Sequence, residues 1–177
     1  MELIRSAEGL RLKGRLSLTV FGPDGGITDH RDGDNVTCIN GLTAFAAALV
    51  WSGVQDQAAA IGVTSPTYLT PLYGAVGSGS GTVSTNDTQL FSELGRTVVS
   101  AGASSPAAPS VNAEATWQFY FAQPTVNWTV TECGVFANAT DATNAGTLLD
   151  HWAFSPTVSV PTTNTLLLQV VFSVLGS

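Results

Sequence analysis

A two-residue alternation of apolar and polar side chains recurs along this chain of 177 residues and restricts its fold more than any other feature. The alternation is clearest at residues 10–20, and it returns at residues 115–121, 126–130 and 165–175. A period of two gives a β-strand one buried and one exposed face. Gly, Pro and Asn turns separate these segments at the spacing of antiparallel sandwiches, about 8–12 residues. The sequence therefore predicts a mainly β fold, an antiparallel β-sandwich.

One segment, residues 40–53, has the period of a helix instead. Its apolar residues form a single stripe: Leu42, Phe45, Ala46, Leu49 and Val50. Asn40 can cap the first turn, and Gly53 suits the left-handed position after the last one. An amphipathic helix in a β-rich chain must bury its stripe, so we expect one covering α-helix packed on a sheet face. Residues 1–9 are expected to form an N-terminal arm, and residues 10–177 a single domain.

Local turn chemistry gives finer expectations. Residues 27–38 are expected to return as the second strand of a hairpin, interrupted by a solvated polar turn at 29–34. Further strands are expected at 69–76, 96–100, 131–136 and 147–154, with Pro156 ending the last of these. A short helical turn is expected at 88–94, and loops are expected at 54–71, 77–81 and 101–110.

The scarcity of charge indicates a surface that other proteins cover. Charged residues make up 11% of the chain, whereas roughly 25% is usual in soluble domains. Hydrophobic residues make up 44%. We therefore expect a homo-oligomer, although a monomer solubilised by Ser, Thr and Asn fits the same composition.

Two strand faces are candidates for the subunit interface. The polar face of the first strand carries three cations, Arg11, Lys13 and Arg15. They either discourage edge-to-edge pairing or meet an acidic patch on a partner subunit. The last strand is apolar on both faces, which is typical of a central strand or of an interface. Its second face carries Leu167, Val171 and Leu175.

Charge and cysteine content exclude several classes of partner and location. Five of the six basic residues lie in the first 31 positions, and the net charge is −7. Nucleic acid is therefore not an expected partner, because phosphate binding needs clustered Lys and Arg. No secretory signal is expected at the N-terminus, and no apolar run reaches the roughly 20 residues of a membrane span. Cys38 and Cys133 are expected to be reduced core residues.

No constellation of residues indicates catalysis, a metal site or a cofactor. The Gly-rich run at 77–81 lacks the Lys of a phosphate-binding loop, and the acidic residues at 29–34 lack the spacing of a calcium loop. His30 and His151 are the candidate general bases, and Glu114 and Glu132 are the best-placed carboxylate pair. Nothing in their spacing requires either pair to meet. We therefore expect a protein that is not an enzyme.

Several short motifs follow one another in a familiar order. They are RLKGRLSLTVFGPDGG at 11–26, VTCINGLTAFAAAL at 36–49, YGAVGSGSG at 73–81, NDTQLFSELGR at 86–96, ATWQFYF at 115–121, TVTECGVF at 129–136 and GTLLDHWAFSPTVSVPTTNTLLLQVVFSV at 146–174. Their order is similar to that of a family of tailed-bacteriophage virion structural proteins, often described as tail or tail-fibre-associated. The matching positions are Asn40, Gly41, Leu42, Gly77, Gly79, Leu90, Glu93, Arg96, Glu132, Gly134, Phe136, Gly146, Leu148, Phe154 and Pro156.

The resemblance spans about residues 10–175 and implies a non-enzymatic virion protein with no catalytic residues. Such a protein assembles in the host cytoplasm, self-associates, with a trimer favoured, and docks on the tail at the fibre, baseplate or neck. A capsid decoration (cement) protein that binds the major capsid protein is the alternative within this class. A carbohydrate-binding module is a second alternative, because sandwiches often bind sugars. Trp117 and Trp128, however, lie on apolar strand faces and are expected in the core.

Overall fold

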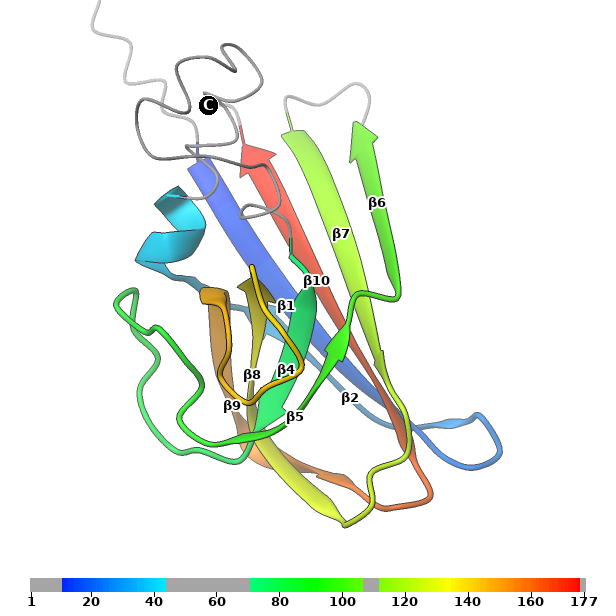
Figure 1. Ribbon diagram of the computed structural model, residues 1–177. Coiled ribbons are helices and arrows are strands. Elements are labelled where there is room, and N and C mark those ends of the chain that lie inside the picture. The colour runs from blue at the N-terminus through cyan, green and yellow to red at the C-terminus, as the bar shows by residue number, and fades with distance from the viewer. Residues whose placement is uncertain (1–10, 44–70, 107–111, 176–177) are drawn as a thin grey trace, which may run out of the picture.

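The computed structural model describes residues 11–43, 71–106 and 112–175. Two five-stranded antiparallel sheets pack face to face, and one short helical segment at 39–43 lies beside them (Figure 1). The predicted antiparallel β-sandwich is therefore confirmed. The arm expected at 1–9 and most of the expected helix, residues 44–53, lie outside the described residues.

The first sheet, here called sheet A, has the strand order β2-β1-β10-β7-β6. Its strands are β1 (Arg11–Phe21), β2 (Ile27–Asp34), β6 (Ala101–Pro106), β7 (Asn112–Phe121) and β10 (Thr165–Leu175). The C-terminal strand β10 lies in the centre, between β1 and β7. Its inward residues Leu166, Leu168 and Val170 are fully buried, so one of the two interpretations of its apolar faces, the central strand, is confirmed.

The second sheet, sheet B, has the order β3-β9-β8-β4-β5. Its strands are β3 (Val36–Thr37), β4 (Tyr73–Gly77), β5 (Glu93–Val98), β8 (Trp128–Ala137) and β9 (Thr147–Val160). The chain passes from sheet A to sheet B between β2 and β3, with only Asn35 between them. Residues of this crossover therefore touch both layers.

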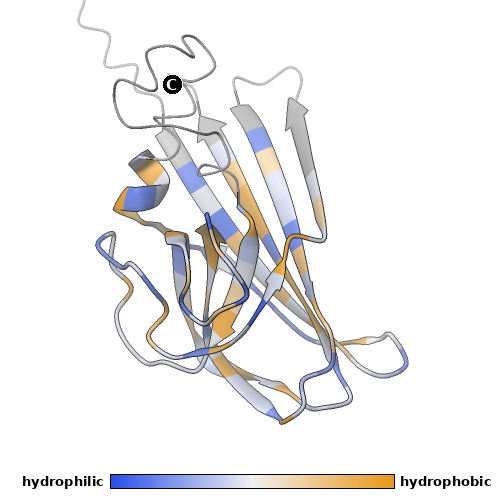
Figure 2. Cartoon of the chain, in the orientation of Figure 1, coloured by the Kyte–Doolittle hydropathy of each residue, from blue (hydrophilic) through white to orange (hydrophobic). Residues whose placement is uncertain are grey.

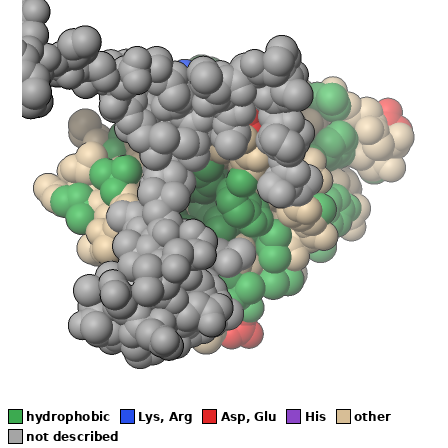
Figure 3. Space-filling model, turned by 90° about the horizontal axis from the view of Figure 1, so that it is seen from above, with side chains coloured by type: hydrophobic (Ala, Val, Ile, Leu, Met, Phe, Trp, Pro, Cys, Tyr) green, Lys and Arg blue, Asp and Glu red, His purple; other side chains and the backbone are tan. Residues whose placement is uncertain are grey.

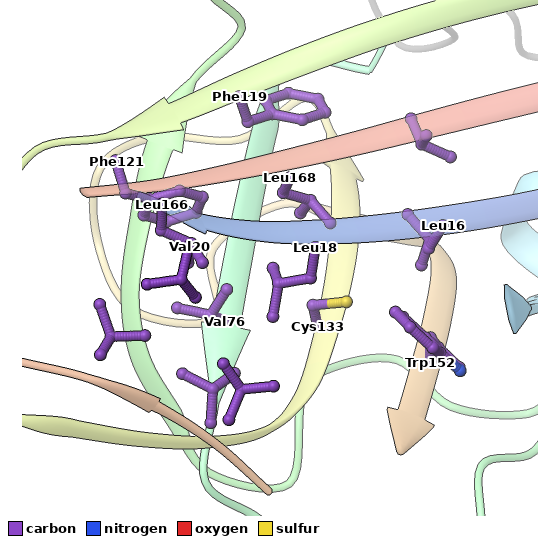
Figure 4. Close-up of a cluster of buried hydrophobic side chains, with 14 of the residues drawn as sticks. Leu16, Leu18, Val20, Val76, Phe119, Phe121, Cys133, Trp152, Leu166 and Leu168 are labelled. Atoms are coloured by element: carbon purple, nitrogen blue, oxygen red, sulfur yellow. The ribbon is translucent and has the colours of Figure 1, made fainter. Parts of the chain in front are cut away.

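The core fills the space between the two sheets and follows from the two-residue period. Hydrophobic and hydrophilic residues alternate along the long strands (Figure 2). From sheet A, the side chains of β1 and β10 point toward Val76 and Cys133 of sheet B (Figure 4). The fully buried members from β1 and β10 are Leu16, Val20, Leu166, Leu168 and Val170. Both cysteines are buried and unpaired, as expected.

One glycine allows the sheets to approach closely. A Cβ at Gly74 of β4 would lie 2.5 Å from the ring of Phe119, which is fully buried on β7 of the opposite sheet. Any side chain here would collide with that ring, because real Cβ contacts are longer. The glycine in β4 thus makes room for the ring of Phe119.

The polar run at 29–34 is a strand and not the solvated turn that the sequence suggests. Strand β2 continues through it, and its residues pair with β1 from Arg15↔Asp34 to Val20↔Asp29. Acidic side chains of β2 neutralise cations of β1, which makes a charged strand stable at the sheet edge. Strand β1 is consequently an interior strand, so its cations do not protect an edge.

Three other local expectations are also wrong. Residues 101–106 form β6, which pairs with β7 through the backbone despite its low-complexity sequence. Residues 88–92 contain no helix. Strand β9 continues past Pro156, because pairing stops at Ala153 and resumes at Val158, so the residue without an N–H sits in an unpaired bulge.

The described helical segment begins at Ile39, earlier than the sequence predicts. The N–H of Leu42 donates to the carbonyl of Cys38 at 3.0 Å, so Cys38 and not Asn40 holds the capping position. A Cβ at Gly41 would lie 2.3 Å from the carbonyl oxygen of Leu149, which shows how closely this turn approaches β9. None of the described helical residues belongs to a helix long and apolar enough to cross a membrane.

Candidate subunit interface

All six residues predicted for the subunit interface lie on β1 and β10, adjacent strands of sheet A. The register pairs Arg11 with Leu175 and Arg15 with Val171, while Lys13 lies opposite Ser173 and Leu167 opposite Thr19. These positions alternate with the buried ones, so they share the face that points away from sheet B. We call this surface the outer face. For Arg11 and Leu175 only the register position is described.

Two cations of the outer face, Lys13 and Arg15, are paired within the chain. Lys13 Nζ lies 3.0 Å from Oδ1 of Asp34, and Arg15 forms an ion pair with Asp32. The side chains of Lys13 and Arg15 remain 53% and 61% exposed, so each pair contributes only about 0–1 kcal/mol. An acidic patch on a partner subunit is therefore not needed to neutralise these cations.

A hollow of about 230 Å³ lies near the middle of the outer face. It is lined by Arg15, Ser17, His30, Asp32, Gln169 and Val171. Nδ1 of His30 lies 2.8 Å from the hydroxyl of Thr19, and Gln118 Nε2 donates to Gln169 Oε1 at 3.3 Å. The hollow is therefore a mixed polar and apolar depression in a sheet face, shared by three strands.

Apolar side chains adjoin this hollow without a covering layer among the described residues. Leu167 and Val171 are half-buried, and Tyr120, which pairs with Leu167 in register, is 49% exposed. Hydrophobic side chains also gather at the end of the sandwich where β1 begins and β10 ends, seen from above in Figure 3. The outer face thus combines neutralised charges, uncharged polar groups and apolar area, which is typical of a protein-binding surface.

Sequence reasoning missed the acidic half of this face. Asp32 and Asp34 have the same two-residue spacing as Lys13 and Arg15. Two pairs of opposite charges with a matching period indicate pairing between two strands. The prediction of a turn at 29–34 left this pairing unrecognised.

A second polar cluster, here called the Glu132 network, is buried on the other face of sheet B. Oε1 of Glu132 accepts the N–H groups of Gly79 at 2.9 Å and Ser92 at 2.8 Å. Oε2 accepts the N–H of Phe91 at 2.9 Å and lies 2.9 Å from Nε2 of His151. One carboxylate therefore fastens both ends of the loop that joins β4 to β5.

The hydrogen bonds decide the charge of this carboxylate. Burial alone raises the pKa of Glu132, but the bonds from His151 and from three backbone N–H groups outweigh burial and hold the pKa below its usual range. Glu132 is therefore ionised and accepts, so Nε2 of His151 donates. Nδ1 of His151 lies 2.7 Å from Oδ2 of Asp87, and the ring of Phe91 packs at 4.8 Å.

This network does not have the arrangement of a catalytic site. Both ring nitrogens of His151 face carboxylates, and the ring is fully buried. A general base needs one nitrogen free to take a proton from a nucleophile or water. Glu114 is exposed on β7 of sheet A, where it accepts from Ser173 at 3.0 Å, so the two glutamates considered as a pair lie on different sheets.

A third polar cluster holds the loop between β8 and β9. Arg96 Nε donates to Glu93 Oε1 at 2.6 Å, and Nη2 donates to Oε2 at 2.7 Å. The same guanidinium donates to the carbonyls of Thr140 and Ala145, and Glu93 accepts the N–H of Asn144 at 2.8 Å. Both charged side chains are at most 3% exposed. This ion pair is thus a structural anchor.

The tryptophans considered for sugar binding pack on the core. Trp117 and Trp128 are half-buried against the main cluster, Trp117 edge-on to Phe172 at 5.6 Å. Trp152 is 8% exposed. Within the part of the chain that the structure describes, no group of three or more His, Cys, Asp or Glu side chains is placed to hold a metal ion.

Comparison with known proteins adds no relative. No family model, no curated protein and no solved structure matches this chain.

Proposed function

We propose that this chain is a non-enzymatic structural protein of a tailed-bacteriophage virion. It self-associates through the outer face of sheet A and docks on the tail. The observation that carries the proposal is where the matching positions of the motifs lie. Although they are spread over more than 100 positions, they gather on sheet B and in the loops fastened to it.

Most of the matching positions have a structural task there. Gly77 and Gly79 leave room for the carboxylate of Glu132, because a Cβ at either would lie 2.5 Å from its Oε1. Glu93 and Arg96 anchor the loop that ends at Gly146. Three of the apolar members, Leu90, Phe136 and Leu148, form one buried cluster with Cys38 and Ala75. Motifs that build a scaffold fit a family of structural subunits.

The outer face of sheet A lies apart from the matching positions. None of its six predicted interface residues is one of these positions, and two of the six, Arg15 and Val171, line the hollow on the opposite side of the sandwich. A scaffold on one sheet with a separate binding face on the other suits a structural subunit, because a fold can carry a binding surface that is independent of its core. The low charge of the chain favours the same function, because an exterior with few ions is stabilised by burial against protein.

Self-association is tested with two matched variants. Size exclusion with light scattering at micromolar concentration is expected to give an oligomer for the unchanged protein, with a trimer as the favoured state. Val171→Arg places a charge in the outer face and is expected to give a folded monomer. Val126→Arg is the control, since Val126 is 63% exposed in the loop between β7 and β8, away from this face. A clean monomer for the unchanged protein would contradict self-association.

The position in the particle is tested by imaging. Electron microscopy of virions labelled with an antibody against this chain is expected to show label on the tail. Label spread over the capsid surface instead would favour the decoration protein, which binds the major capsid protein. Absence from purified particles would contradict both positions.

A further inference from the structure

Four buried polar atoms at one end of the core have no hydrogen-bond partner in the described structure. They are Oδ1 and Nδ2 of Asn35 and both carboxyl oxygens of Asp150. Asp150 is 0% exposed. Leaving one such group unsatisfied costs about 1–3 kcal/mol, and native proteins rarely do so. The coincidence of all four atoms in one place therefore needs a chemical explanation.

The fold brings the two side chains together between the sheets. Asp150 is two positions before the core residue Trp152 on β9, so it points inward from sheet B. Asn35 links β2 to β3, and its amide fills the space beneath Gly14 of β1. A Cβ at Gly14 would lie 2.2 Å from Oδ1 of Asn35, which explains the glycine at an inward position of an otherwise apolar strand.

No cation among the described residues faces the carboxyl group of Asp150. On β1, Lys13 and Arg15 lie on the outer face in ion pairs with β2. His151 of β9 and Glu132 of β8 point to the opposite side of sheet B, where they bind each other. His151 also binds Asp87.

The two nearby thiols are uncharged. Burial, with Asp150 adding to it, raises the pKa of Cys38 to about 12 and that of Cys133 well above its usual value. An ionised Asp150 would therefore be a buried negative charge with no counterion among these neighbours, which is strongly unfavourable.

We propose that Asp150 and Asn35 form a buried proton-binding site, in which a neutral carboxylic acid pairs with the amide and fastens β3 to β9. A protonated carboxyl group has one donor and one acceptor, and a primary amide offers the complementary acceptor and donor. The pair is complete only when the proton is present, because an ionised carboxylate and the amide oxygen are both acceptors.

The electrostatics of the site agree with this pairing. Burial raises the pKa of Asp150 to about 8, although the neighbouring polar side chains of Thr37 and Asn35 act to lower it. The site thus holds its proton at neutral pH and releases it in mildly alkaline solution.

Loss of the proton acts on a weak point of the fold. Strand β3 has two residues, and its ladder to β9 consists of Val36↔His151 and Thr37↔Asp150. The helical segment follows at once, held by the N–H of Cys38, which donates to the carbonyl of Leu149 at 2.9 Å. Ionised Asp150 leaves the amide oxygen of Asn35 without a donor and places an unpaired negative charge in the core, so β3 and the turn at 39–43 separate from sheet B while the core strands stay paired.

The test combines carboxyl NMR with hydrogen exchange. In protein labelled with ¹³C-aspartate, the carboxyl carbon of Asp150 is expected to titrate above pH 7. Between pH 6 and pH 9, the protection factors of amides 36–42 are expected to fall at least about tenfold more than those of β10. In the Asp150→Asn variant this extra loss of protection is expected to be absent, because the amide does not ionise. The control variant Asp141→Asn, changed at an exposed position, is expected to lose protection at 36–42 as the unchanged protein does.

Three results would overturn the proposal. A carboxyl carbon of Asp150 that titrates below pH 5 excludes a stored proton, and this measurement needs no variant to fold. Protection at 36–42 that falls equally in Asp150→Asn assigns the loosening to another group. Protection that depends on added Ca²⁺ or Mg²⁺ and is lost in EDTA makes a cation the occupant of the site in place of the proton.

Discussion

Nε2 of His151 donates to Oε2 of Glu132 across 2.9 Å, and both side chains are completely buried. These residues lie on the neighbouring strands β9 and β8, and each also binds the loop between β4 and β5. Leu90 is the one fully buried apolar residue among residues 78–92 of this loop. The position of the loop therefore depends largely on hydrogen bonds to these two side chains.

Replacing Glu132 by Gln is expected to destabilise the fold by about 2–4 kcal/mol. The glutamine keeps the size of the side chain, but its NH₂ group faces backbone N–H donors that then have no acceptor. Chemical denaturation with a linear extrapolation measures the change. The control is Glu114→Gln, which alters an exposed carboxylate and is expected to change stability by less than about 0.5 kcal/mol. Equal effects of the two substitutions would show that the Glu132 network is not an anchor.

The same carboxylate predicts a loss of stability in acid. The pKa of Glu132 is lower in the folded protein than its ordinary value of 4.5. The unfolded chain therefore binds a proton first as the pH falls. The stabilisation is complete above pH 4.5 and disappears as the pH falls through the folded pKa. Free energies of unfolding at a series of pH values from 6 to 2 should fall more steeply for the unchanged protein than for Glu132→Gln. Parallel curves would contradict the lowered pKa.

Period-two patterns predicted the layers of this fold because they report burial directly. The bounds of β10 coincide with the predicted 165–175, since both its faces are apolar and turn residues flank it. Strand β6 escaped notice because its residues, AGASSP, show no alternation and it is held to β7 by backbone pairing. Backbone pairing leaves little trace in side-chain composition.

The candidate sites were predictable to different degrees. The outer face of sheet A follows from alternation on two strands, and the structure places those strands side by side. The partners of Glu132 did not follow, because its three backbone donors are 40 to 53 positions away in a loop without regular structure. The pairing of Asn35 with Asp150 depends on a crossover between sheets, which no local period records.

Arg96→Lys is expected to cost about 2–4 kcal/mol although it conserves the charge. The guanidinium of Arg96 donates to both oxygens of Glu93 and to two loop carbonyls, and a single ammonium group cannot reach all four acceptors. The matched control is Arg31→Lys, whose side chain is 32% exposed beside Asp29 and should lose less than about 1 kcal/mol. Chemical denaturation of both variants measures the two changes in the free energy of unfolding. An Arg96→Lys variant as stable as the unchanged protein would contradict the anchoring role.

Asp150 predicts a pH dependence of opposite sign. Its pKa is about 8 in the folded protein, and the value for an ordinary Asp is 3.8. Between these two values the folded state binds a proton that the unfolded state has lost, so stability falls as the pH rises from about 4 to about 8. Asp150→Asn removes this penalty and is expected to be more stable than the unchanged protein at pH 8, by several kcal/mol at most. The gain should shrink toward pH 4. A gain that is the same at both pH values would show that Asp150 does not titrate in this range.

Phe172 tests where the core ends along β10. The alternation along 165–175 places Phe172 on the core face with Leu168, and for a fully buried Phe172 truncation to Ala is expected to cost about 3–5 kcal/mol. In the structure Phe172 is half-buried, resting edge-on against Trp117, whereas Leu168 is 0% exposed. We therefore expect Phe172→Ala to cost about 2–3 kcal/mol, less than Leu168→Ala, because part of the ring is already in contact with water. Chemical denaturation of the two variants gives the comparison. A cost below about 1 kcal/mol for Phe172→Ala would place its ring outside the core.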